Sequence, residues 1–483
     1  MRNLDFKNKK IVLSDDVKVL VVLILSMIFG LPLISGNAAL YAVTSIITVF
    51  FLVVIVIFKP YLFLSVFFAS VYPVSQTIGK LGVDNLGIAF ILMLSLLALV
   101  FIVQRKNFTF NKERLLLFLP FYMIIAVVVF GAVTGFLHSG NDSLEILVKF
   151  FVFGVIPAFF LTVMPLDKEN VISILELSYY LNLIIFLGFS VAYWFFRILN
   201  PSSFATFFAD FDNPIGISLF LMQFVLFSLL FIVFGNVSEK RRIFIYASML
   251  LAFIYVMITF QRSFILAIAG ALTYFIVSKY KIGIKMIAVA VVVATVFTFA
   301  LSNISMFLNE YQISKLEKTL NFVEKLSQNK NVLRAKENED LGTIGYRIVK
   351  IVAAFGKIKE KPYFGNGLGT FSNFAEYKYP HNIIVEFLYS TGIVGLFIVL
   401  FSMIRIFLKS HSMIKKMPDG KLKNMFLITN SFIVLCFVIL QFSGGVMNLF
   451  PHLCFMLSSV FVALYCINKK EIKGETCREI TEK

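Results

Sequence analysis

The chain has 483 residues, of which 59% are hydrophobic and only 15% are charged, and its mean hydropathy is +0.90. This apolar content is far above that of an ordinary soluble domain, so a soluble enzyme is excluded and most of the chain is expected to lie in lipid. The formal net charge of +17 does not indicate nucleic-acid binding, because Lys and Arg collect in short connectors between apolar runs.

Apolar runs of near membrane-spanning length recur along almost the whole chain. A helix that crosses the hydrocarbon core needs about 20 mostly apolar residues, and about 14 runs approach that length. The runs predicted to span are residues 19–34, 40–58, 61–74, 86–103, 115–137, 144–164, 172–196, 215–234, 243–260, 264–277, 286–304, 383–406, 425–442 and 453–467. The predicted fold is therefore an all-α polytopic membrane protein.

The basic connectors predict the orientation of these helices. With the N-terminus in the cytoplasm, the inner connectors contain the basic clusters at residues 105–114, 240–242, 279–285 and 409–423, whereas the short outer connectors are nearly free of positive charge. Cytoplasmic loops of membrane proteins have such an excess of Lys and Arg. We therefore predict an even number of helices with both ends of the chain in the cytoplasm.

This orientation divides the chain into five regions along its length. They are a cytoplasmic N-terminus (1–18), transmembrane helices 1–11 (19–304), a large helical extracytoplasmic loop (305–380), transmembrane helices 12–14 (383–467) and a cytoplasmic tail (468–483). A loop of this length is expected to have structure of its own. Residues 313–326 have the spacing of an amphipathic helix, and a second helix is predicted over 344–359, before a turn with Gly365, Gly367 and Gly369.

Four residues on the predicted outer side are candidates for chemistry. Arg262 lies in a tight hairpin between two apolar runs, and Arg347 precedes Lys350 by one helical turn. One guanidinium group can bind two phosphate oxygens at once, so arginines at this surface would suit a lipid-linked pyrophosphate. Interfacial or solvated basic side chains would have the same sequence pattern. His381 lies where the chain re-enters the membrane and could accept a proton near neutral pH.

Acidic residues near the outer ends of the predicted helices need a second explanation, because charge inside a span is expensive. Glu145 and Lys149 are expected to form an ion pair at i and i+4. Glu386 could tune His381 or make a polar contact between helices. Asp212, in the connector before residue 215, is a candidate for the acceptor site.

One ordered set of motifs resembles the bacterial O-antigen ligase and polymerase family. The signature of that family is similar to a pattern at the start of a helix after the large outer loop. The pattern is His381-Asn382, nine further residues and then Gly392-x-x-Gly395. The landmarks upstream occur in the same order over residues 205–400. They are Asp212-Asn213-Pro214, Arg262, Arg347, Pro362 and Gly365/Gly367/Gly369. The two glycines of the signature are expected to pack their helix closely against a neighbour.

The resemblance implies a membrane glycosyltransferase that uses polyprenyl-linked sugars, inverts the anomeric centre and needs no metal or other cofactor. His381 would be the catalytic base or would position the acceptor. Arg262, Arg347 and Lys350 would hold the donor pyrophosphate. The supporting residues would be Asn382, Glu386, Asp212, Gly365, Gly367 and Gly369.

The function predicted in this way is an O-antigen or surface polysaccharide polymerase in the bacterial cell (inner) membrane, with its active site facing the periplasm or exterior. The partners would be an undecaprenyl-pyrophosphate-linked glycan, an acceptor glycan or glycolipid, membrane lipid, a chain-length regulator and a flippase, and no nucleic acid. Alternatives are an O-antigen ligase that transfers glycan to lipid A core, oligosaccharide transfer to protein, a lipid-linked oligosaccharide flippase and an envelope scaffold.

Overall fold

A computed structural model describes part of the chain, and the functional landmarks after residue 240 fall largely within that part. It describes a few isolated positions between residues 25 and 116, followed by residues 118–139, 141–163, 168–199, 214–234, 237–258, 262–279, 342–373 and 380–443. Some predictions lie wholly or largely outside the described residues: the spans before residue 115, the spans 286–304 and 453–467, the helix 313–326, and Asp212.

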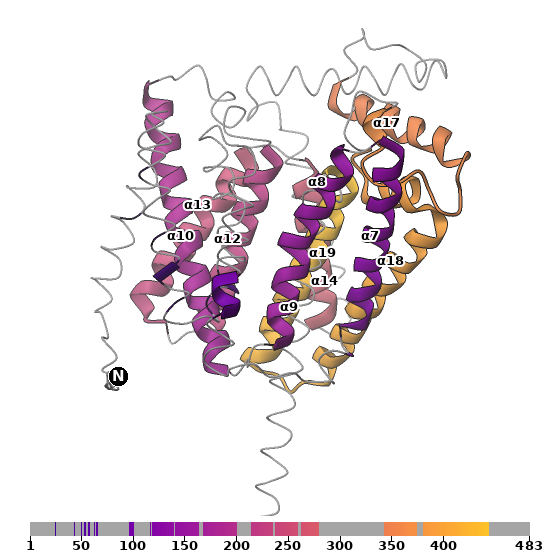
Figure 1. The fold of residues 1–483 in the computed structure, drawn as a ribbon. Helices are drawn as coiled ribbons and strands as arrows, with labels where there is room; N and C mark the ends of the chain where they lie inside the picture. Colours follow the sequence, from indigo (N-terminus) through magenta and orange to yellow (C-terminus); the bar gives the residue numbers. More distant parts are fainter. Residues whose placement is uncertain are drawn as a thin grey trace, which may run out of the picture.

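Every regular element among the described residues is helical. In chain order these are α7 (Leu119–Ser139), α8 (Asn141–Phe150), the π-helical segment Phe151–Val155, α9 (Ile156–Val163), α10 (Lys168–Leu199), α12 (Pro214–Phe234), α13 (Glu239–Ile258), α14 (Arg262–Lys279), α17 (Gly342–Ile358), the 3₁₀ turn Phe371–Asn373, α18 (Ile383–Lys416) and α19 (Lys421–Ser443). All but α17 and the 3₁₀ turn coincide with a predicted apolar run. The fold described is an all-helical bundle (Figure 1).

Four of these helices are long and apolar enough to cross a membrane. They contain the spans Leu119–His138, Asn170–Val191, Ile383–Lys416 and Lys423–Gln441. Shorter apolar helices run over Phe220–Val233 and Leu266–Lys279. The described part thus has the helices of a multi-pass membrane protein, while the total of about 14 spans stays a prediction.

The predicted span 144–164 is divided into α8, a π-helical segment and α9. The division occurs beside Pro157, whose nitrogen cannot donate the i→i−4 bond of an α-helix, and π-bulges are one way in which a helix absorbs such a defect. On α8 the Lys149 ammonium donates to the Glu145 carboxylate, which confirms the expected ion pair.

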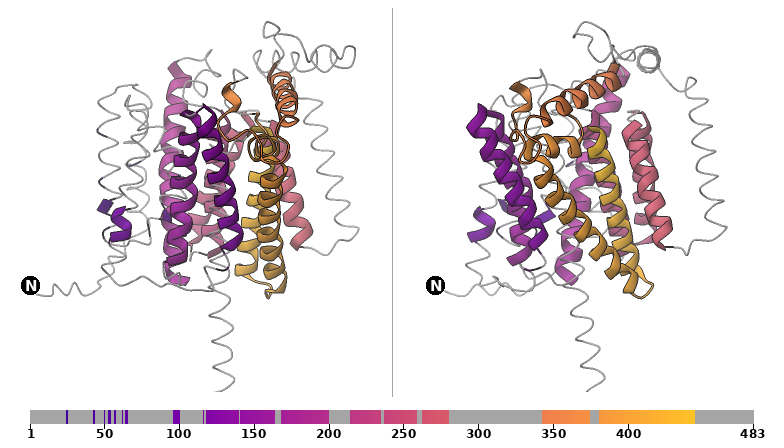
Figure 2. Two further views of the ribbon diagram at one scale, coloured as in Figure 1. Left: turned by 45° about the vertical axis from the view of Figure 1, so that its right-hand side comes forward. Right: turned by 90° about the vertical axis from the view of Figure 1, so that its right-hand side faces the viewer.

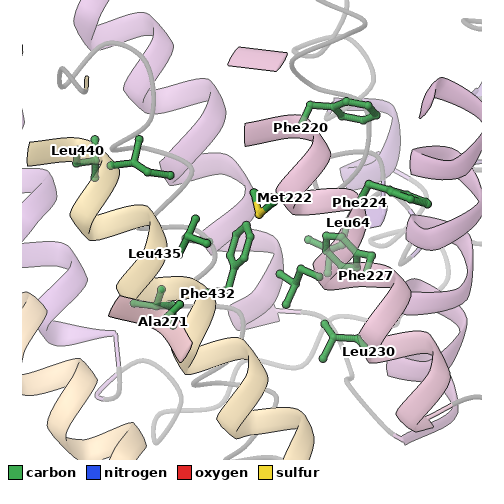
Figure 3. Packing of buried hydrophobic residues seen from close by; sticks show 14 of the residues in the cluster. Leu64, Phe220, Met222, Phe224, Phe227, Leu230, Ala271, Phe432, Leu435 and Leu440 are labelled. Carbon is green, nitrogen blue, oxygen red and sulfur yellow. The ribbon is translucent and has the colours of Figure 1, made fainter. Parts of the chain in front are cut away.

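Aromatic side chains form much of the contact between the helices. Tyr179 of α10 stacks on Phe231 of α12 with ring centroids 4.8 Å apart, and Phe186 stacks on Phe224 at 4.6 Å. On its other side α12 packs on α19, which in turn packs on α14, and the buried side chains there include Phe432 and Ala271 (Figure 3). The Phe-rich composition therefore serves the core of the bundle.

Two features of this fold position the candidate site. The first is α17, which crosses one end of the bundle and packs on α18 (Figures 1 and 2). The second is a break in α18 at Gly392, whose φ of +67° and ψ of −172° are not helical. The expectation that both signature glycines allow close packing holds only in part for Gly392, which interrupts the helix and leaves room for the backbone of Tyr363 and Phe364.

The break frees backbone groups, and one upstream segment satisfies them. The N–H groups of Ile393 and Val394 donate to the carbonyls of Pro362 and Tyr363, at 2.9 and 3.3 Å. In the opposite direction, the freed carbonyls of Tyr389 and Ser390 each accept a bond of 2.8 Å from Asn366 and Gly367. The glycine-rich segment is therefore built into α18.

Candidate active site

The helix α17 presents one face to the first part of α18. Ile351, Ala354 and Ile358 recur at helical spacing and pack against Val385 and Tyr389, with Phe371 closing the cluster. The predicted helix 344–359 is thus confirmed, with bounds two residues earlier at its start and one at its end. Because Arg347 and Lys350 continue the same face toward the start of α17, packing brings them toward the start of α18.

His381 occupies the turn through which the chain enters α18. Its φ is +59°, a left-handed conformation that only a few per cent of non-glycine residues adopt, with Asn, Asp and His enriched. The side chain is half-buried, and its Nδ1 atom is fully buried. A residue held in this conformation is oriented by the surrounding fold, which is one way that a site is preorganised.

Burial and two cations act together on His381. Its pKa is lowered from 6.5 to about 4, first by burial and then by the charges of Lys350 and Arg347. All three causes disfavour the imidazolium form. His381 is therefore neutral at pH 7, which is the form in which an imidazole can accept a proton.

Lys350 lies deep in this site. It is 7% exposed, and burial followed by the charge of Arg347 lowers its pKa to about 8. At pH 7 it is still mostly protonated, because that pKa lies above neutrality. Two neighbouring cations, one of them buried, make a place where an anion would be strongly favoured.

Arg262 is the first residue of α14, and the pairing of α14 with α19 places its backbone. Gly270 faces Val434 and Val438, and the Tyr274 hydroxyl accepts from the Asn430 amide, so the two helices are antiparallel. Eight residues of helix before Gly270 extend about 12 Å toward the C-terminal end of α19. The start of α14 therefore lies at the same end of the bundle as His381.

Asn382 holds the start of α18 in place. Its side-chain oxygen accepts from the Val385 N–H at 3.0 Å, the geometry of a helix N-cap, and its amide donates to the Gln441 carbonyl of α19 at 3.0 Å. Asn382 thus connects α18 to α19 directly beside His381. Its contacts make it a residue that positions the histidine turn.

We expect Asn382→Ala to lower the unfolding free energy by about 1 kcal/mol for the lost cap, with a further loss for the bond to Gln441. Asn382→Asp keeps an acceptor for the Val385 N–H but loses the amide donor. Its unfolding free energy is expected to lie between those of the parent protein and Asn382→Ala. Thermal unfolding in detergent measures both, with the exposed Asn373→Ala as control. Equal melting temperatures for all three variants would contradict a capping role.

Glu386 lies in the first turn of α18 and is 4% exposed. A carboxylate in the first turn of a helix is stabilised by the partial positive charge of that helix end. The pKa of His381 is nevertheless lowered, by burial and by the charges of Lys350 and Arg347. A supporting role for Glu386 therefore stays a proposal.

The glycine-rich turn connects α18 with α7. The Leu368 N–H donates to the Gly131 carbonyl at 2.8 Å, and a Cβ at Gly367, whose φ is +97°, would collide with the backbone of Gly135. The N–H groups of Gly365, Asn366, Gly367 and Leu368 all donate to backbone carbonyls, so these four are not available to bind a phosphate. The glycines allow a close approach of backbones.

Three residues of this contact were missed in the sequence. Gly131 and Gly135 of α7 leave room for the turn, and the Ser143 hydroxyl donates to the Leu368 carbonyl at 2.6 Å. The signal available was the spacing Gly131-x-x-x-Gly135, which is typical of close packing in membrane helices. Here the partner is a loop, which spacing alone does not indicate.

Among the residues that the structure describes, no group of three or more His, Cys, Asp or Glu side chains could hold a metal ion. Buried Lys350 and its neighbour Arg347 are cations, which suit an anionic ligand. Metal independence of the reaction stays a prediction.

The neutral His381 lies beside two cations, one of them buried, at one end of a bundle of apolar helices, and this arrangement favours an anionic ligand. Residues 247–400 match the model of a protein family described as O-antigen ligase, so the chain has an O-antigen ligase family domain over these residues. The match begins within α13 and ends within α18, and it includes Arg262, Arg347 and His381. No curated protein matches the chain.

Proposed function

We propose that the protein is a polysaccharide polymerase of the cell membrane, with its site facing the periplasm or exterior. It transfers a glycan from undecaprenyl pyrophosphate to the terminal sugar of a lipid-linked repeat unit. The observation that carries this proposal is the neutral, half-buried His381 under the positive charge of Lys350 and Arg347, within the O-antigen ligase family domain.

In the proposed reaction, an acceptor hydroxyl attacks the anomeric carbon of the donor sugar. A new carbon–oxygen bond forms at that carbon, and its bond to the pyrophosphate oxygen breaks with the electron pair leaving on the pyrophosphate. His381 takes the hydroxyl proton, and Arg347, Lys350 and Arg262 stabilise the negative charge of the leaving group. Attack opposite the leaving group inverts the anomeric centre.

The low pKa of His381 gives the donor a second role. An imidazole whose pKa is about 4 is neutral at pH 7 but only a weak base. A bound pyrophosphate would neutralise Lys350 and Arg347, remove two of the three causes that lower the pKa, and raise the basicity of His381. The base would therefore be strengthened once the donor is in place.

Lys350→Gln tests this coupling. We expect weaker donor binding, with KM raised about 10- to 100-fold for the loss of one charge-assisted contact. Because only neutral His381 accepts a proton, kcat/KM should fall as pH drops through its pKa. Removing the Lys350 charge raises that pKa, so the acid limb of kcat/KM should move to higher pH. An unchanged acid limb would contradict the coupling of Lys350 with His381.

The second candidate is an O-antigen ligase, which the description of the family model names. Both functions are tested in cells that lack the native protein, with surface glycan resolved on a gel. For a polymerase we expect loss of long chains while a single repeat is still transferred. Absence of all glycan from the lipid A core, with lipid-linked polymer accumulating, would instead identify a ligase.

A further inference from the structure

The glycine-rich turn lies well below the ends of the helices it contacts. Its residues Pro362 and Tyr363 bond to the backbone of α18 just after Gly392, and Leu368 bonds to Gly131 of α7. Gly131 is eight residues before the end of α7, and Gly392 is nine residues after the start of α18. At 1.5 Å per residue, the eight residues of α7 after Gly131 place this contact about 12 Å from the end of α7.

Both helices are candidate membrane spans, so this depth is within the apolar part of the bundle. Irregular backbone is tolerated at such a depth only where its polar groups are satisfied within the protein. Much of the turn meets this condition, because the N–H groups of Asn366, Gly367 and Leu368 donate to α18 and α7, and the Gly365 N–H donates to the Lys361 carbonyl at 3.1 Å.

Two aromatic residues at the tip of the turn face outward. Tyr363 is 66% exposed and Phe364 is 62% exposed. The Phe364 ring lies edge-on to Phe130 of α7 with centroids 6.4 Å apart. An exposed aromatic pair at this depth needs an apolar partner.

The exposed apolar surface continues on both sides of this pair. On α18, one helical face exposes the apolar side chains of Ile393, Phe397, Phe401, Ile404 and Leu408, and on α7 the exposed residues include Phe130, Val133 and Phe136. These are the outward faces of two candidate spans, where lipid is the expected neighbour. The pair joins the two faces into one apolar surface.

The polar groups of the same segment lie toward the helix ends. The Lys361 ammonium contacts the His138 imidazole near the end of α7 at 3.2 Å, and Lys357 forms an ion pair with Glu360 at 2.8 Å. Lysines near the helix ends, with aromatic residues deeper in the bundle, match the order of headgroups and acyl chains from the membrane surface inward.

We propose that Pro362–Leu368 is a re-entrant membrane element and that Tyr363 and Phe364 contact the phospholipid acyl chains of the leaflet on the side of α17. The segment predicted as part of an extracytoplasmic loop thus returns into the membrane beside the site. This proposal does not depend on the reaction that the protein catalyses.

Tryptophan fluorescence in liposomes tests the contact. The chain has a single tryptophan, Trp194, so Trp194→Phe gives a background for one reporter at a time. The reporter is Phe364→Trp, with Tyr363→Trp as a second position. Phe397→Trp on the exposed face of α18 is the lipid control, and Asn373→Trp, at an exposed polar position after the turn, is the water control.

Phosphatidylcholine brominated on its acyl chains is expected to quench the reporters at 364 and 397 alike, with blue-shifted emission, while aqueous iodide quenches only the reporter at 373. Quenching of the reporters at 363 and 364 by iodide would overturn the proposal. Blue-shifted emission that neither agent quenches would also overturn it, because protein, including a second copy of the chain, would then cover the turn.

Discussion

Replacing His381 with Asn is expected to lower glycan transfer by about 10²- to 10⁴-fold, the range for loss of a general base. Asparagine is chosen because His381 has a positive φ, which Asn tolerates better than Ala does. The substitution removes the imidazole while keeping the turn into α18. The measurement is the initial rate of polymer formation at equal amounts of folded protein.

The matched control is His138→Asn. His138 is an exposed histidine at the same end of the bundle, and its contact with Lys361 is also exposed. We expect normal transfer from this variant. Full activity of His381→Asn at normal expression would remove His381 from the chemistry.

Gly392→Ala is expected to destabilise the fold by at least about 1–3 kcal/mol, the cost of a non-glycine residue at such a φ. A Cβ there would also collide with the backbone of Tyr363 and Phe364, which cannot move aside without breaking its bonds to α18. The measurement is thermal unfolding in detergent, together with the yield of monodisperse protein.

Gly356→Ala is the control for Gly392→Ala. Gly356 lies within α17, and a Cβ there would have no neighbouring atom within 4 Å, so alanine should be neutral or stabilise the helix by about 0.5–1 kcal/mol. If Gly392→Ala unfolded at the temperature of the parent protein, the account of the break in α18 would be wrong.

The positions of the described spans could be predicted from the sequence, because a helix in lipid needs a long apolar run and little else. The run 215–234, for example, became α12 with bounds Pro214–Phe234. The ends of α17 were predicted within two residues from an apolar periodicity that ends before Pro362. Both signals are local in the sequence.

The break in α18 could not be predicted in the same way. A glycine inside an apolar run fits close packing as well as a kink. What decides between them is the pairing of residues 389–394 with a segment 23–31 residues upstream, which a local pattern does not contain.

The proximity of three candidate residues could be predicted from the sequence, but the electrostatics of the candidate site could not. The ordered motifs and the charge-based topology grouped His381 with Arg347 and Lys350, and these cations do lower the pKa of His381. The burial of Lys350 was not foreseen, because a lysine near the start of an amphipathic helix usually faces water. It is buried because the apolar stripe beside it packs on α18.

Reconstitution tests the central claim most directly. Purified protein in liposomes is given undecaprenyl-pyrophosphate-linked repeat units on the side of α17, and both glycan length and released undecaprenyl pyrophosphate are followed. The account predicts longer lipid-linked glycans and one released carrier for each new glycosidic bond, both lost in His381→Asn. Movement of intact lipid-linked units across the bilayer without any new bond would contradict it and would identify a flippase.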